Sequence, residues 1–157
     1  MHVEIWSVGK ANEPFMDAAI SHYLQKIKPY NSIELVVLAP SKKAATTDIT
    51  RTKLAEEELI LKRLQAQHYL VLLDERGKTL DSIQWSEQFQ QCMNTGTKTL
   101  VILIGGAFGV TDAVRQKARQ VWSLSKLVFP HQLVRLIVAE QVYRTFSILN
   151  NSPYHHI

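Results

Sequence analysis

Residues 99–109 read TLVILIGGAFG, and this stretch decides how the remainder of the chain folds. Residues 99–104 are the most strongly apolar run in the sequence, which predicts a central strand covered on both faces. Gly105, Gly106 and Gly109 follow, and their missing side chains would let the backbone approach a ligand closely. A tight turn from strand to helix would explain the same glycines. The stretch therefore predicts a buried strand that ends in a candidate binding loop.

Strands and helices alternate on either side of this central strand. Apolar runs predict further strands at residues 2–8, 33–38, 69–73 and 121–124, and helical spacing predicts helices at residues 15–27, 54–64, 83–93, 112–118 and 131–149. Asn12 and Ser82 are expected to cap two of these helices, and residues 74–78 are expected to form a charged turn. This order predicts an α/β fold, with a mainly parallel sheet flanked by helices, as a single domain of residues 1–157.

Ligands of parallel sheets bind beyond the carboxyl ends of the strands, so three loops are candidates for the site. They are residues 73–78, 105–109 and 124–131. The glycine spacing at 105–109 matches neither the dinucleotide pattern GxGxxG nor the phosphate loop GxxxxGK[ST]. Nucleotide hydrolysis is therefore poorly supported.

Basic residues are concentrated in the last quarter of the chain. The net charge is +4, whereas residues 115–157 contain six bases and only one acid, Glu140. A phosphate-rich partner would explain this excess, and so would a solvated basic face. Residues 41–52 (SKKAATTDITRT) are expected to form a polar loop, in which Lys42, Lys43 and Arg51 either contact RNA or are simply solvated.

Metal and membrane functions are not expected. The single cysteine, Cys92, has no second cysteine as a partner, and the adjacent His155 and His156 on an extended tail would point to opposite sides. The beginning of the chain lacks the pattern of a secretory signal, and no apolar stretch reaches the length of a membrane span. These features predict a cytoplasmic protein without a metal.

The helix expected at residues 131–149 has a broad apolar stripe, wider than one side of a monomer normally buries. A homodimer is therefore expected. Glu140 and Arg144 lie four residues apart in this helix, a spacing that favours a simple ion pair.

Several short segments, taken together and in order, resemble one known family. They are Leu73-Asp74 with Gly77-Lys78, Ile104-Gly105-Gly106, and the C-terminal runs FPHQLVR (129–135), AEQVYRTF (139–146) and NSPYHH (151–156). None is specific alone, but their order and spacing along the whole chain are similar to those of the RlmH family of ribosomal RNA methyltransferases, which belongs to the SPOUT class.

The resemblance implies a SPOUT α/β-knot, in which the C-terminal segment forms a trefoil knot, and a homodimer that binds S-adenosylmethionine in the knot. It also implies the substrate, a pseudouridine in helix 69 of 23S rRNA, methylated at N3 in the assembled 70S ribosome. Residues matched to the cofactor contacts of the family are Leu73, Gly105, Leu124, Ser125, Lys126, Leu127, Val128 and Phe129.

Methylation at N3 would require the imide to lose its proton, and the C-terminal segment offers His131, Arg144, Tyr154 and His155 for this chemistry. We expect Arg144 and Tyr154 near the target base, with His131 shaping the loop and His155 as a proton acceptor. Simpler roles exist: Tyr154 could only stack on the base or pack the tail, and His131 could cap the last helix. Two other functions stay open, namely a SPOUT enzyme acting on another RNA such as tRNA, and a non-enzymatic α/β module that binds a nucleotide or RNA.

Overall fold

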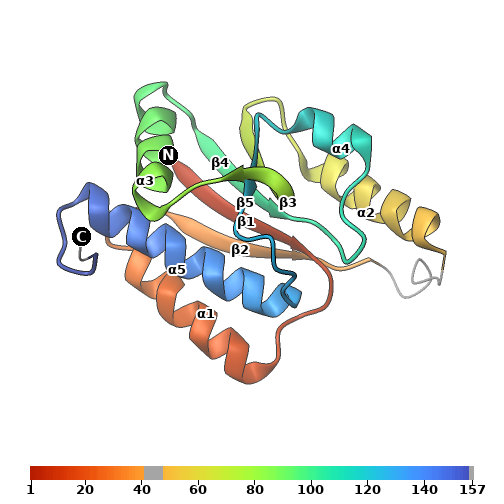
Figure 1. Ribbon diagram of the computed structural model, residues 1–157, viewed down its shortest axis with the longest axis horizontal. Coiled ribbons are helices and arrows are strands. Elements are labelled where there is room, and N and C mark those ends of the chain that lie inside the picture. The colour runs from red at the N-terminus through yellow and green to blue at the C-terminus, as the bar shows by residue number, and fades with distance from the viewer. Residues whose placement is uncertain (41–47, 156–157) are drawn as a thin grey trace.

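The computed structural model describes residues 1–40 and 48–155. Strands and helices alternate through the chain (Figure 1). In order they are β1 (His2–Val8), α1 (Pro14–Ile27), β2 (Ile33–Leu38), α2 (Ile49–Arg63), β3 (His68–Thr79), α3 (Ser82–Asn94), β4 (Thr99–Ile104), α4 (Asp112–Lys117), β5 (Gln120–Ser123) and α5 (His131–Leu149). The predicted strand and helix order is confirmed.

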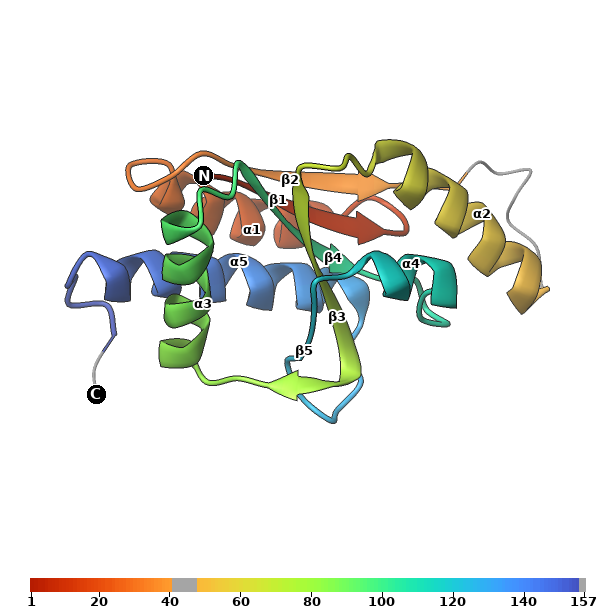
Figure 2. The same cartoon turned by 90° about the horizontal axis from the view of Figure 1, so that it is seen from above.

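The five strands form one parallel sheet in the order β2-β1-β4-β3-β5. The apolar strand β4 lies in the middle, as expected, and five of its six residues are buried. Alternate residues of the sheet point to two cores. Ile5 and Ile102 face the helices α1, α3 and α5, whereas Trp6 and Leu103 face α2 and α4. Figures 1 and 2 show this three-layer arrangement, with α1 beside α5.

Strand β3 continues through the segment that was expected to be a charged turn. Leu73 pairs with Trp122 of β5, the register then shifts, and Lys78 pairs with the same Trp122. The two halves of β3 thus contact one short strand. Gly77 makes this possible, because a Cβ at this position would lie 2.6 Å from the Trp122 carbonyl carbon.

Two expected helix caps were wrong. Helix α1 has Glu13 as its N-cap, and Pro14 occupies its first turn, while the Asn12 side chain accepts a hydrogen bond from Arg135 instead. Helix α3 is capped by Asp81, which forms a capping box with Gln84, so Ser82 is already its first residue.

The last four residues of the polar loop expected at residues 41–52 are helical instead. Helix α2 already begins at Ile49, and the Asp48 carboxylate accepts hydrogen bonds from the Thr50 and Arg51 backbone amides. Lys42 and Lys43 lie outside the described residues.

Helix α5 spans the molecule and buries a cation in its first half. The Arg135 side chain is 1% exposed, and its guanidinium donates hydrogen bonds to Ser7 Oγ, the Lys10 carbonyl oxygen and Asn12 Oδ1 at 2.7 to 2.8 Å. These bonds join α5 to the turn after β1. Among the described residues, no helix has the length and apolar character that crossing a membrane requires.

Candidate functional site

A cavity of about 520 Å³ opens at the carboxyl ends of β4 and β5, beside the point where the first half of β3 ends at Leu73. This is the edge of the sheet where ligands of parallel α/β folds bind. Most of its lining comes from the three segments selected by the sequence. The lining residues are Leu72, Leu73, Asp74, Glu75, Ile104, Gly105, Gly106, Ala107, Gly109, Val110, Leu124, Ser125, Leu127, Val128, Phe129, Pro130, His131 and Val134. The volume falls in the range of small-molecule sites.

Seven of the eight residues predicted to contact a cofactor line this cavity: Leu73, Gly105, Leu124, Ser125, Leu127, Val128 and Phe129. Lys126, the eighth, is exposed and is not part of the lining. Leu127 and Val128 are 70% and 89% exposed, so two apolar side chains stand at the mouth without cover from the described residues. A flat apolar ligand, or another protein surface, would bury them favourably.

Sequence reasoning did not single out several lining residues. Val110 packs its Cγ1 against Gly105, and Val134 extends the apolar wall by one helical turn from His131. Val110 directly follows the predicted glycine loop, and Val134 lies one helical turn after His131. These two positions in the sequence could have indicated that both residues line the cavity.

The Asp74 carboxylate at the end of this wall is held by two cations. Arg76 donates to it through its backbone amide at 2.9 Å and through Nε and Nη2 at 3.0 Å, and Arg115 forms a further ion pair with Oδ2. The hydrogen bonds from Arg76, more than the neighbouring Arg115 charge, lower the pKa of Asp74 to about 2. Asp74 is therefore ionised at neutral pH and fixes the loop instead of acting as a base.

His131 lies in the cavity wall as the first residue of α5, where Pro130 takes the N-cap position. Burial lowers the pKa of His131, and the nearby Arg135 cation lowers it further. The imidazole is thus neutral at physiological pH, so that one ring nitrogen is a donor and the other an acceptor.

Three of the predicted catalytic residues meet beside the second half of α5, around Glu140 at the middle of the helix. Arg144 Nε and Nη2 donate to Glu140 Oε1 at 3.0 and 2.5 Å, which confirms the expected i,i+4 pair. The Tyr154 hydroxyl donates to the same oxygen at 3.0 Å, and His155 Nδ1 lies 3.4 Å from Arg144 Nη1. Arg144 also covers the Tyr154 ring at 4.8 Å.

Charge and burial tune this C-terminal cluster, defined here as Glu140, Arg144, Tyr154 and His155. Hydrogen bonding to Glu140 raises the pKa of Arg144, and burial together with hydrogen bonds to Tyr23 and Glu140 raises the pKa of Tyr154. Both groups therefore stay protonated at neutral pH. They can donate hydrogen bonds to an anion, but Tyr154 cannot serve as a base there.

The fourth predicted catalytic residue, His131, is not part of this cluster. It lies thirteen positions before Arg144 in the same continuous helix, which corresponds to about 20 Å at 1.5 Å per residue. One subunit therefore brings together Arg144, Tyr154 and His155 but leaves His131 with the cavity.

Three of the six bases in residues 115–157 are buried or paired with acidic residues of the protein itself. Arg135 is buried, Arg115 is paired with Asp74, and Arg144 is paired with Glu140. The exposed bases of this segment are Lys117, Arg119 and Lys126. Any surface that attracts phosphate groups through this segment depends mainly on these three.

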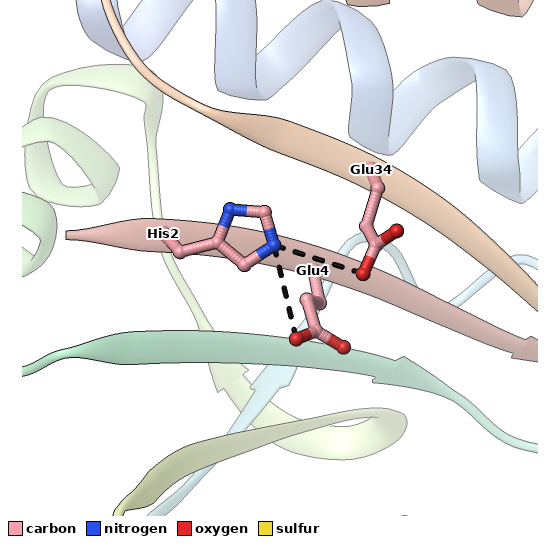
Figure 3. Close-up of side chains that lie close together, drawn as sticks. All are labelled: His2, Glu4 and Glu34. Atoms are coloured by element: carbon pink, nitrogen blue, oxygen red, sulfur yellow. Dashed lines mark ion pairs between the residues drawn. The ribbon is translucent and has the colours of Figure 1, made fainter.

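A separate cluster of polar side chains, formed by His2, Glu4 and Glu34, lies at the opposite, amino-terminal end of the sheet (Figure 3). His2 Nε2 is 3.8 Å from Glu4 Oε1 and 3.7 Å from Glu34 Oε1, a composition that could hold a metal ion. However, the Arg63 guanidinium lies 3.3 Å from Glu4 and 3.6 Å from Glu34, so it already compensates their charge. The expectation of a protein without a metal stays a prediction.

Comparison with known proteins adds to this geometry. The family model described as "Predicted SPOUT methyltransferase" matches residues 1–155. Proteins named ribosomal RNA large subunit methyltransferase H are 41% identical in Parabacteroides distasonis, 40% in Flavobacterium johnsoniae and 35% in a Clostridium botulinum strain, each with 99% of both chains covered. The chain therefore belongs to the SPOUT methyltransferases and, among them, to the family of ribosomal RNA large subunit methyltransferase H.

Proposed function

We propose that this protein transfers a methyl group from S-adenosylmethionine to N3 of pseudouridine 1915, in helix 69 of 23S rRNA, within the assembled 70S ribosome. The relatives are named as methyltransferases of large-subunit ribosomal RNA, which supports this class of acceptor. The observation that carries the proposal is the cavity at the carboxyl ends of β4 and β5 and of the first half of β3, lined by seven of the eight residues matched to cofactor contacts.

The chemistry of the cavity suits S-adenosylmethionine. Apolar walls from Leu73, Leu124 and Phe129 can pack against the neutral adenine ring, and the backbone of Gly105 and its neighbours can meet its polar edge. Lys126 belongs to the proposed contact set only through its backbone, between Ser125 and Leu127, because its side chain is exposed. When bound, the cofactor supplies a methyl group on a sulfonium, so no metal is required for the transfer.

A trefoil knot is part of the proposal. The two halves of β3 pair with the same residue of β5, and Gly77 leaves room for the Trp122 backbone beside the bulge. The chain of β5 therefore lies against a loop formed by β3 before it enters the cavity wall at Leu124. This arrangement supports threading of the C-terminal segment.

We further propose that two subunits build one active site. Within one chain, Arg144 and its cluster lie about 20 Å along α5 from His131, too far to act on a methyl group held in the cavity. A homodimer that places the C-terminal cluster of one subunit over the cavity of the other would remove this gap. It would also cover the exposed Leu127 and Val128.

The C-terminal cluster then acts on the acceptor base. Methyl transfer needs an in-line approach of N3, and the weakly acidic imide must lose its proton. Arg144 and Tyr154 are both protonated and can stabilise the negative charge that develops on the base, while His155 accepts the proton. His131 shapes the cavity wall.

The proposal predicts a specific product in the cytoplasm of the cell. Ribosomal RNA from cells lacking this protein should contain unmodified pseudouridine at the helix 69 position, and expression of the protein should convert it into N3-methylpseudouridine. Mass spectrometry of digested RNA measures both nucleosides. Retention of the unmodified nucleoside after expression of folded protein would contradict the proposed acceptor.

A further inference from the structure

A buried carboxyl group lies directly behind the glycine loop of the cavity. Glu56 of α2 is only 8% exposed, although it is a charged residue type. A Cβ at Gly106 would overlap Glu56 Oε2 and would lie only 2.5 Å from both Cδ and Oε1. The Glu56 carboxyl group therefore occupies the space that a side chain at position 106 would need.

Helix α2 holds the same loop at a second point. The neighbouring Glu57 accepts a hydrogen bond from Thr111 Oγ1, and Thr111 is the N-cap residue of α4. The two consecutive glutamates thus contact the segment between β4 and α4 near its beginning, at Gly106, and at its end, at Thr111. Gly106 itself lines the cavity.

Placing a carboxyl group here has a cost. Burial raises the pKa of Glu56, and the positive charge of Lys53 only partly opposes this. A solvated position elsewhere on α2, such as that of the exposed Glu58, would avoid the penalty. The packing against Gly106 is the feature that distinguishes Glu56 from Glu58.

We propose that Glu56 is a positioning residue of the methyltransferase. Its carboxyl group contacts Gly106 and thereby fixes where the Gly105–Gly106 backbone lies in the cavity wall. The inference rests on the proposed function, because the ligand whose binding depends on the position of this backbone is S-adenosylmethionine. Glu56 touches neither the cofactor nor the acceptor. It acts through the loop.

Reciprocal size changes test the contact. The variants are Glu56→Ala, Gly106→Ala and the double variant, with Glu56→Gln as the conservative change and Glu58→Ala as the control on the exposed face of α2. Calorimetry measures the Kd of S-adenosylmethionine for each full-length protein, thermal melting checks that each is folded, and steady-state assays on ribosomes separate the KM of the cofactor from kcat.

Gly106→Ala should displace the carboxyl group and weaken cofactor binding about tenfold, equivalent to about 1.4 kcal/mol. Glu56→Ala should weaken it by less, and the double variant should bind better than Gly106→Ala alone because the added methyl group fills the vacated space. Glu56→Gln should bind within about threefold of the wild type, equivalent to less than 1 kcal/mol. These effects should appear in KM and not in kcat.

Two results would overturn the inference: a double variant that binds no better than Gly106→Ala, or a Gly106→Ala protein that binds like the wild type. Failure of the proposed function looks different. In that case the wild type and the Glu58→Ala control would themselves not bind S-adenosylmethionine.

Discussion

The Tyr154 hydroxyl donates a hydrogen bond to Glu140 Oε1 over 3.0 Å, and this bond fixes the C-terminal tail to helix α5. The same oxygen accepts from Arg144, so one carboxylate positions two side chains that are proposed to face the acceptor base. Tyr143 packs edge-on against the Tyr154 ring at 4.6 Å and completes the anchor.

Replacing Tyr154 with Phe should therefore slow methyl transfer without affecting cofactor binding. The ring would still pack, but the loss of its hydroxyl frees the tail from Glu140, and misplacement of about 1 Å can cost about 100-fold in rate. Single-turnover assays on ribosomes measure the rate, and calorimetry measures the Kd of S-adenosylmethionine. Tyr30→Phe, at an exposed tyrosine, is the matched control. Transfer within twofold of the wild type would remove the Tyr154 hydroxyl from the mechanism.

Replacing Gly77 with Ala should destabilise the fold. The new Cβ would meet the Trp122 and Val121 backbone at 2.6 to 2.8 Å, and neither strand can move aside without breaking its pairing. We expect a loss of about 3 kcal/mol in the free energy of unfolding, as in other overpacked sites.

Urea denaturation measures this loss, and Gly96→Ala provides the comparison. Gly96 has a φ of +74°, but no heavy atom lies within 4 Å of the position that a Cβ would take there. Its replacement should therefore cost only about 1 kcal/mol of backbone strain. If both variants lost the same free energy of unfolding, close contact between β5 and Gly77 would not be the cause.

The predictability of the fold differs between local and long-range features. Apolar periodicity correctly predicted the strand and helix order, because each element buries one face and therefore leaves a pattern in its own residues. The continuation of β3 through residues 74–78 was missed. These charged residues carry no strand pattern, and their pairing depends on β5, more than forty residues later in the chain.

The candidate site was predictable to a similar extent. The rule that ligands bind at the carboxyl ends of parallel strands selected the three loops that line the cavity. The separation of His131 from Arg144 could have been read from the sequence, because both were assigned to one helix. The burial of Glu56 could not, since it depends on how α2 packs against Gly106.

Arg135 is expected to be important for stability. Replacing it with Met would preserve most of its volume but leave Ser7 Oγ, the Lys10 carbonyl and Asn12 Oδ1 without their donor. We expect the free energy of unfolding to fall by about 3 kcal/mol, the scale for losing hydrogen bonds from a buried charged group. Replacing the exposed Arg119 with Met should change it by less than about 0.5 kcal/mol in the same denaturation experiment. Similar small effects at both positions would contradict this role.

The ion pairs of Asp74 predict a stability that depends on pH. The pKa of Asp74 is lowered in the folded protein from 3.8 to about 2, so its contribution is present above pH 3.8 and is lost as the pH falls through about 2. Asp74→Asn should therefore be less stable than the wild type at pH 7, and the difference should shrink between pH 4 and pH 2. Denaturation at several pH values measures both curves. A difference that stays constant down to pH 2 would show that the charge of Asp74 is not the cause.

The three exposed bases Lys117, Arg119 and Lys126 predict the salt dependence of RNA binding. If all three contact phosphates, replacing them with Ala should weaken binding to ribosomes and reduce the slope of log K against log salt by about 2 to 3. Cofactor affinity should not change. An unaltered slope in filter-binding assays over a range of salt concentrations would place the RNA surface elsewhere.

The most direct test of the proposed function is transfer of a tritiated methyl group from S-adenosylmethionine to four acceptors: 70S ribosomes, free 50S subunits, naked ribosomal RNA and bulk tRNA, all from cells that lack this protein. We expect label in 70S ribosomes alone, located at the helix 69 pseudouridine. Label in tRNA, or none in 70S ribosomes despite cofactor binding, would contradict it.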